Sequence, residues 1–354
     1  MKLNVISFTG HGKRLSERIA KLLGKELEME LYTKCKADDR DDVFSDILYV
    51  KSSVGDWTKE QMQEKNALLF IGACGIAVRA IAPFLTDKLH DVPVLVMDDE
   101  GKYIIPILSG HMGGANDLAN RIAEKTAAKA VITTATDLHH KFAVDLFAKR
   151  NSLFMVNKDG IAKVSSKVLA GGGITISIET GHETACKEAG VRTVPYPPAG
   201  FADVVVTSED DVFDTALLLK PKEYVIGIGC KRGKKAEEID AFISKTINRA
   251  GISVTQIFAL ASVSQKQDEQ GIVEWCRKEG IPFLTYTAEE LREVNGSFAE
   301  SFFVREQVGV GNVCERAALK ACGEGGELLV KKTAENGMTI AAARRKWKVY
   351  FDGR

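Results

Sequence analysis

The stretch ALLFIGACGIAVR, residues 67–79, decides how the fold of this chain is interpreted. Five apolar residues, 67–71, predict a buried strand, and glycines at Gly72 and Gly75 then lead into the helical spacing of Ile76–Phe84. A strand that ends in a glycine turn and continues as a helix is typical of open α/β sheets, which bind ligands at the carboxyl ends of their strands. The stretch therefore predicts an α/β fold and one edge of a ligand site.

A second glycine turn follows, with the sequence SGHMGGAND at residues 109–117, and it precedes the helical pattern Leu118–Ala128. Backbone N–H groups in such a turn, together with the amino end of the helix, are suited to hold a carboxylate or a phosphate. The alternative is a tight strand-to-helix connection in which Asn116 or Asp117 only caps the helix. A third segment, VITTATD at residues 131–137, then closes the unit with a strand and a polar exit.

One residue of the second turn, His111, is the best candidate in the chain for a general acid or base. Glycine alone would serve a turn, whereas histidine adds a group that titrates near neutral pH. The other histidines are isolated or lie next to an expected helix start: His11, His90, His139, His140 and His182.

Composition limits the class of protein. The 354 residues are 45% hydrophobic, and 48 basic residues balance 48 acidic ones, so no overall field favours nucleic acid or an anionic membrane. We expect a cytoplasmic protein, because the start of the chain lacks a signal-peptide pattern and no apolar run reaches the roughly 18 residues of a membrane span. Seven scattered cysteines without a CxxC pair predict reduced thiols, with neither disulfides nor a zinc site.

Alternating strand and helix patterns predict three α/β units with mostly parallel sheets, the first of them flavodoxin-like in pattern. We place the units at residues 1–137, 138–220 and 221–354. The expected strands are Leu3–Phe8, Ala67–Ile71, Val94–Met97, Tyr103–Ile107, Val131–Thr134, Leu153–Val156, Ile174–Ile178, Val204–Val206, Tyr224–Gly229, Thr255–Ala261, Phe283–Tyr286, Leu328–Lys332 and Met338–Ala342. The expected helices are Leu15–Leu23, Ile76–Phe84, Leu118–Ala128, His140–Arg150, Thr184–Ala189, Ala236–Asn248, Asp268–Lys278 and Val313–Ala321.

The third unit begins with a cationic loop, GIGCKRG at residues 227–233. It lacks the third glycine of a dinucleotide-binding loop, because Arg232 stands there, so a nucleotide site is weakly supported. Lys231, Arg232, Lys234 and Lys235 at the end of a strand instead suit a ligand with several carboxylates. The alternative is a solvated basic helix start, which the positive end of the helix dipole disfavours.

Two more loops of the third unit carry polar residues. Ser262, Lys266 and Glu269 lie on an expected loop after a strand, and Glu315 follows Asn312 with the spacing of a capping box. Neither Ser109 nor Ser262 has a GxSxG context, so the sequence does not support a serine-hydrolase triad.

Together these segments resemble the cobalt-precorrin-5A hydrolase family of anaerobic cobalamin biosynthesis. The segments similar to the amino-terminal part of that family are 75–79, 81–83, Lys88, 109–116 and 133–137. Those similar to its carboxyl-terminal domain are 227–233, 261–262, Lys266, 268–269 and 309–315. The match covers most of the chain in order, and the middle segment is weakly marked.

The resemblance implies a cobalt tetrapyrrole substrate whose acetate arm is closed as a δ-lactone. The enzyme opens the lactone and releases the extruded carbon, with its methyl group, as acetaldehyde. Water must be activated, the oxyanion stabilised, and the freed alcohol deprotonated for a retro-aldol cleavage. The substrate carries the cobalt, so neither a cofactor nor a protein metal site is expected.

The resemblance also implies roles for individual residues. His111 is the catalytic candidate, backbone N–H groups of Gly113 and Gly114 are oxyanion or carboxylate donors, and Arg79 is one of several cations that pair with peripheral carboxylates. The full set of substrate-binding candidates is Arg79, Ser109, Gly113, Gly114, Asn116, Thr134, Asp137, Cys230, Lys231, Arg232, Ser262, Lys266 and Glu315.

Two alternatives stay open at this point. A non-catalytic carrier of a corrinoid intermediate would release no acetaldehyde, and a flavin or nucleotide protein with flavodoxin-like alternation would need a phosphate loop that the sequence lacks. A homodimer and contacts with other enzymes of the cobalamin pathway are also open.

Overall fold

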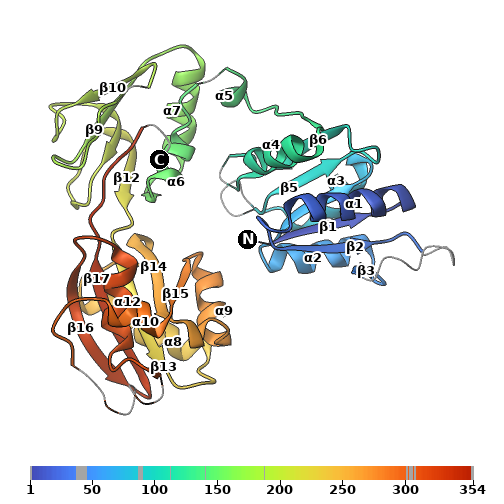
Figure 1. The fold of residues 1–354 in the computed structure, drawn as a ribbon. Helices are drawn as coiled ribbons and strands as arrows, with labels where there is room; N and C mark the ends of the chain where they lie inside the picture. Colours follow the sequence, from blue (N-terminus) through green and yellow to red (C-terminus); the bar gives the residue numbers. More distant parts are fainter. Residues whose placement is uncertain are drawn as a thin grey trace. The chain divides into compact units, whose positions relative to one another are not determined.

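The computed structural model describes residues 2–36, 46–86, 91–111, 113–139, 141–186, 188–299, 302, 306 and 308–351 (Figure 1). Three sheets with interleaved helices confirm the expected mixed α/β fold. The chain forms two compact units, Met1–Leu146 with the first sheet and Phe147–Arg354 with the other two. The boundaries at 137 and 220 stay predictions.

The first sheet has the strand order β3-β2-β1-β4-β5-β6-β7. Its strands are β1 Leu3–Ser7, β2 Met29–Thr33, β3 Ile47–Tyr49, β4 Ala67–Ile71, β5 Val94–Met97, β6 Tyr103–Leu108 and β7 Lys129–Ala130. The first five are parallel, while β6 pairs antiparallel with β5 and parallel with β7. The flavodoxin-like order 2-1-3-4-5 is not reproduced strand for strand, because β3 adds an outer strand and β6 is reversed.

Helices cover both faces of this sheet, which explains why β4 is apolar along its whole length. Leu69 and Ile71 face α1 (Gly10–Leu23) and α4 (Ala115–Thr126), and Leu68 and Phe70 face α2 and α3. The remaining helices of this unit are α2 Val54–Gln63, α3 Cys74–Ile81, the 3₁₀ turn η1 Ala82–Phe84, α5 Ala135–Leu138 and the start of α6 Val144–Arg150.

The reversal of β6 separates the two glycine turns that the sequence suggested as one site. Residue Leu108 at the end of β6 pairs with Val94 at the beginning of β5, and Ile104 pairs with Met97 at its end. The turn after Leu108 therefore lies at the amino edge of the parallel strands, whereas the turn after Ile71 lies at their carboxyl edge. The two turns are at opposite edges of one sheet.

The second sheet has the order β10-β9-β11-β12-β8 and is parallel except for β8. Its strands are β8 Leu153–Met155, β9 Ile174–Ile178, β10 Val191–Val194, β11 Ala202–Val206 and β12 Thr215–Pro221. Helix α7 (Asp159–Leu169) packs on β12 and β9 through its apolar residues Ile161, Val164 and Val168.

The third sheet has the order β15-β14-β13-β17-β16, with β13, β14 and β15 parallel and β17 antiparallel to both of its neighbours. Its strands are β13 Tyr224–Cys230, β14 Ile257–Val263, β15 Phe283–Tyr286, β16 Glu327–Glu335 and β17 Met338–Arg344. Helices α8 (Ala236–Arg249) and α9 (Gln270–Glu279) cover one face, and α10 (Ala288–Arg292) and α12 (Val313–Cys322) cover the other. The short 3₁₀ turns are η2 Val254–Gln256 and η3 Ser264–Lys266.

Several expected elements differ from the structure. Residues 131–134 are not a strand, and the segment expected as the helix Thr184–Ala189 precedes strand β10 without forming a helix in its described residues. Helix α6 begins at Val144, and the expected start at His140 lies outside the described residues, as do Lys88, His90 and Met112. Other elements were not anticipated, namely β2, β3, α2, β7, α5, α7, β10, β12 and α10. No helix among the described residues is long and apolar enough to cross a membrane.

Candidate functional site

The turn between β6 and α4 is built by close backbone approaches. Ser109 has a left-handed φ of 55°, and its Oγ donates to the Asp91 carbonyl oxygen at 2.7 Å. A Cβ added at Gly110 would lie 2.7 Å from Asn116 Oδ1, and one at Gly113 would lie 2.4 Å from Ser109 Cβ. Both positions are therefore restricted to glycine by packing.

His111 lies in this turn with 7% of its surface exposed, between a hydroxyl and a carboxylate. Its Nε2 is 3.1 Å from Thr136 Oγ1, and its Nδ1 is 3.4 Å from Asp145 Oδ2. Thr136 and Asp145 are themselves 8% and 3% exposed. A carboxylate only accepts, so it favours the tautomer with the proton on Nδ1, which leaves Nε2 as the acceptor toward Thr136.

A second pair fixes the segment that carries Thr136. Asn116 Nδ2 donates to Thr134 Oγ1 at 2.8 Å, and Asn116 N donates to the Gly110 carbonyl oxygen at 3.1 Å. Asn116 is buried and connects the turn to the Thr134 segment, so the alternative in which Asn116 or Asp117 only caps α4 does not describe this turn. The N-cap residue is Gly114, with a left-handed φ of 88° and no side-chain bond.

One of the two expected oxyanion donors is already used within the turn. Gly114 N donates to the His111 carbonyl oxygen at 3.1 Å, so in this conformation it does not offer its N–H to a ligand. Gly113 stays a candidate. The side chain of Asp137, on α5, lies outside what the structure describes.

Thr136 and Asp145 were not among the residues predicted for the site. Thr136 belongs to the TTATD segment that carries the family resemblance, so the sequence contained a signal from which it could have been selected. Asp145 lies on α6, eight residues after that segment ends, and no local pattern marks it. Only the packing of α6 brings its carboxylate to His111.

Arg79 does not belong to the His111 cluster. An ideal Cβ at Gly75 would lie 3.4 Å from an Arg79 guanidinium nitrogen, so the side chain turns back along α3 toward the carboxyl edge. At that edge Thr9 Oγ1 donates to Asp99 Oδ1 at 2.6 Å, and His11 Nδ1 contacts the Asp99 carbonyl oxygen at 2.6 Å. The expectation of one ligand site with both Arg79 and His111 is therefore corrected.

In the third sheet, the carboxyl ends of β13 and β14 meet at a partly buried ion pair between Lys266 and Glu269. Glu269 accepts from Lys266 Nζ at 2.8 Å and from Gly233 N at 2.6 Å, which ties the cationic loop to the start of α9. Burial raises the pKa of the nearby Cys230 thiol, although Lys266 opposes the shift, so the thiol stays protonated at neutral pH.

The cationic loop keeps exposed charge at Lys231, Arg232 and Lys235. Lys234 pairs with Glu238, which also accepts from Lys235 N at 3.1 Å. Acidic residues in the first turn of α8 offset the unfavourable interaction between the basic residues and the positive end of the helix dipole. The helix dipole therefore gives less support for an anionic ligand than the sequence alone suggested.

Two further candidates have structural partners. Ser262 lies inside β14 rather than on a loop, is fully buried, and donates to the Ile228 carbonyl oxygen at 2.7 Å. Glu315 is 4% exposed, and it accepts from Lys332 N at 2.8 Å and from Asn312 Nδ2 at 2.5 Å. Neither side chain is available to a substrate in this conformation, which corrects both expectations.

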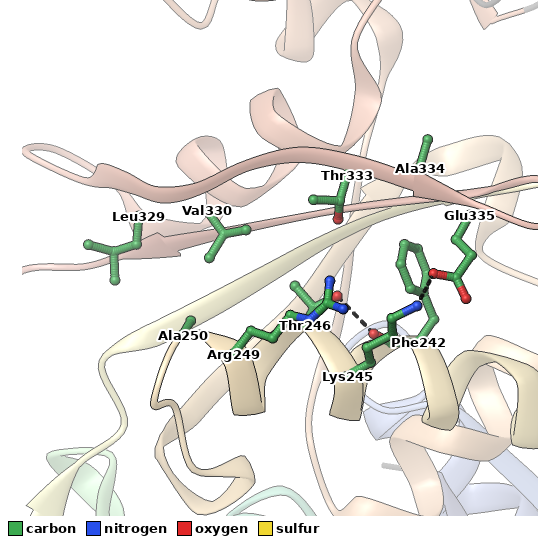
Figure 2. A pocket seen from close by; sticks show the side chains of 10 residues that line it. All are labelled: Phe242, Lys245, Thr246, Arg249, Ala250, Leu329, Val330, Thr333, Ala334 and Glu335. Carbon is green, nitrogen blue, oxygen red and sulfur yellow. Dashed lines mark hydrogen bonds and ion pairs between the residues drawn. The ribbon is translucent and has the colours of Figure 1, made fainter.

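A groove of about 760 Å³ lies between α8 and the edge strand β16 (Figure 2). Lys245 and Glu335 pair across it, and Arg249 lies along its side. The groove contains none of the predicted site residues, and its lining lacks a histidine or a cysteine. The two side chains in it that could transfer a proton, Lys245 and Glu335, pair with each other.

The fold and the His111 cluster define an α/β protein in which a buried histidine between a hydroxyl and a carboxylate is arranged for proton transfer. Residues 56–137 match the family model described as Cobalamin synthesis G N-terminal, and residues 224–343 match Cobalamin synthesis G C-terminus. The chain belongs to the cobalt-precorrin-5A hydrolase family, as the resemblance predicted.

Three known proteins are similar to this chain to different degrees. The chain is 31% identical to the cobalt-precorrin-5A hydrolase of Priestia megaterium, over 96% of this chain and 94% of that one. It is 34% identical to the Salmonella typhimurium cobalt-precorrin-5A hydrolase, over 78% of this chain and 81% of the relative. A crystal structure of a cobalamin biosynthesis protein G homologue from Sulfolobus solfataricus is 21% identical, covering 98% of this chain and 97% of that chain with a TM-score of 0.42.

Proposed function

We propose that this protein is a cobalt-precorrin-5A hydrolase, which opens the δ-lactone of a ring-contracted cobalt tetrapyrrole and releases acetaldehyde to give cobalt-precorrin-5B. The observation that carries the proposal is the histidine–hydroxyl–carboxylate cluster in a chain that matches named hydrolases over most of its length. The cobalt enters with the substrate and no protein cofactor is invoked.

His111 is the proton-transfer group of this reaction. Its Nε2 takes the proton of the group that attacks the lactone carbonyl and returns a proton to the departing ring oxygen. After ring opening, the same imidazole removes the proton of the freed alcohol, so that the carbon–carbon bond breaks and acetaldehyde leaves. The conjugated macrocycle accepts the electron pair of that bond.

The exposed cations of the third sheet are the proposed partners of the substrate's acetate and propionate arms. Lys231 and Arg232 lie at the end of β13 with their side chains exposed, and neither forms an ion pair among the described residues. Guanidinium and ammonium groups bind carboxylates through charge-assisted hydrogen bonds.

We further propose that the protein acts in the cytoplasm, where other enzymes of the pathway would supply its substrate and consume its product.

The test is acetaldehyde release from cobalt-precorrin-5A by the purified full-length chain, with His111→Gln as the matched variant. Glutamine fills most of the space of histidine but does not titrate, so turnover should fall by on the order of 10² or more with the fold retained. Circular dichroism and the melting temperature check the fold. Near wild-type turnover by His111→Gln would exclude His111 as the proton-transfer group.

The same assay distinguishes the enzyme from the carrier alternative. A carrier would bind the tetrapyrrole without producing acetaldehyde, and its bound ligand would keep the mass of the lactone. Two named hydrolases, which align with 96% and 78% of the chain, favour the enzyme.

A further inference from the structure

The Nε2 atom of His111, which accepts the proton, already has a hydrogen-bond partner in the protein. Thr136 Oγ1 lies 3.1 Å from Nε2, on the side of the imidazole opposite Asp145, which is 3.4 Å from Nδ1. Thr136, His111 and Asp145 are 8%, 7% and 3% exposed. The hydroxyl proton of Thr136 is thus the first one that this base can take, and an attacking water would have to displace the hydroxyl.

We propose that Thr136 is the nucleophile that opens the lactone, that His111 is its base and that Asp145 is a positioning residue. This inference rests on the proposed function, because it assigns the attacking group in the lactone-opening step. The order hydroxyl, Nε2, Nδ1, carboxylate is the order in hydroxyl-nucleophile triads, which recur on unrelated folds.

The step balances without a further reactant. Thr136 Oγ1 bonds to the lactone carbonyl carbon while its proton moves to His111 Nε2. The bond between that carbon and the ring oxygen then breaks, and His111 protonates the departing oxygen, which leaves an ester between Thr136 and the acetate arm. Water, deprotonated by His111, next attacks the ester carbon and releases the carboxylate and the Thr136 hydroxyl. Acetaldehyde leaves from the freed alcohol in the separate retro-aldol step.

The surroundings hold Thr136 in the required place. The backbone before it is fixed by the hydrogen bond between Asn116 and Thr134, and its own carbonyl oxygen accepts from Lys141 N at 2.9 Å. Asp145 Oδ1 accepts from Leu146 N at 3.0 Å, so the carboxylate is oriented by the first turn of its own helix. A positioned hydroxyl reacts faster than a mobile one, because its orientation needs no further ordering.

The experiment is a rapid-quench reaction of the full-length chain with cobalt-precorrin-5A, followed by mass spectrometry of the intact protein and of the peptide that contains Thr136. We expect an adduct with the mass of the substrate, or of the substrate less acetaldehyde, on Thr136. Thr136→Ser should retain turnover and form the adduct on serine. Thr136→Val, which keeps the shape of threonine, should lose turnover by on the order of 10³-fold or more.

A matched control uses another buried threonine of the same unit. Thr126 is 6% exposed and its hydroxyl donates to the Ile122 carbonyl oxygen at 2.7 Å within α4, away from the reaction. Thr126→Val should keep turnover, whereas Asp145→Asn should lower kcat with little change in KM, as expected of a positioning residue.

The outcomes separate this inference from the proposed function. Acetaldehyde release by wild type at the same rate as by Thr136→Val overturns the inference and leaves the function standing. An inactive Thr136→Val without an adduct on wild type at any quench time also overturns it, since threonine then only orients the base. If wild type itself releases no acetaldehyde, the function and the inference both fail.

Discussion

Replacing Gly110 with alanine tests whether the packing of the glycine turn controls the His111 cluster. The φ of Gly110 is not left-handed, so alanine adds no backbone strain, but its Cβ would lie 2.7 Å from Asn116 Oδ1 and 3.2 Å from Asn116 Nδ2. Asn116 cannot yield without cost, because its Nδ2 donates to Thr134 Oγ1 at 2.8 Å and the side chain is only 7% exposed. The substitution should therefore break this hydrogen bond.

The magnitude follows from that loss. Breaking a buried hydrogen bond and leaving its partner unsatisfied costs about 1–3 kcal/mol, so we expect Gly110→Ala to lower the free energy of unfolding of the first unit by about 2 kcal/mol. The Thr134 segment also carries Thr136, and a misplacement of reacting groups by about 1 Å lowers rates by up to roughly 10²-fold. The kcat for acetaldehyde release should fall between about tenfold and 10²-fold.

A double-mutant cycle with Asn116→Ala isolates the contact. Asn116→Ala alone loses the hydrogen bond but gives the new methyl group space, so the double variant should be about 1–2 kcal/mol more stable than the sum of the single changes predicts. Urea unfolding measures the stability, and the acetaldehyde assay measures kcat. Additive effects of the two substitutions would refute the argument that Gly110 is required by Asn116.

Two further predictions concern the third sheet. The double substitution Lys231→Gln and Arg232→Gln should weaken corrinoid binding and flatten the dependence of affinity on salt concentration, because exposed charges are screened beyond about 8 Å at physiological ionic strength. The control substitutions Lys245→Gln and Arg249→Gln remove two cations of the α8–β16 groove and should leave the salt dependence of affinity unchanged. If both double variants showed the same salt dependence, the substrate's carboxylates would bind elsewhere. Burial raises the pKa of Glu269, but the hydrogen bonds from Lys266 and Gly233 outweigh this effect and hold the pKa below its usual value. The Glu269 carboxylate therefore stabilises the folded protein at a pH above its pKa in the unfolded chain, and this contribution is lost as the pH falls through its pKa in the folded protein. Denaturant unfolding from about pH 5 downward should show a smaller loss of stability for Glu269→Gln than for wild type, and identical pH curves would contradict the assignment.

Much of the site could be predicted from residues close in sequence. The apolar run before Gly72 predicted a buried strand, and β4 is buried along its whole length. His111 and Asn116 were selected because they lie in a polar turn after a strand pattern, and Thr134 because its segment carries the family resemblance. Asn116 and Thr134 are hydrogen-bonded in the structure. Ser262 and Glu315 were selected by the same reasoning and lie inside the fold instead, because a polar residue near a strand end can equally satisfy a neighbouring backbone group.

The sequence by itself determined the family, the mixed α/β fold and the histidine that carries the proposed proton transfer. Only the tertiary structure decided which groups meet: it puts Arg79 and His111 at opposite edges of one sheet, and it brings Asp145 from a later helix to the imidazole. The five residues between β5 and β6 are too few for a parallel crossover, so the antiparallel direction of β6 could be predicted from the sequence. The contact between Asp145 and His111 could not be predicted from the sequence. Hydrophobic patterns specify which face of a helix or strand is buried, but not which distant polar side chains come within hydrogen-bonding distance when these elements pack.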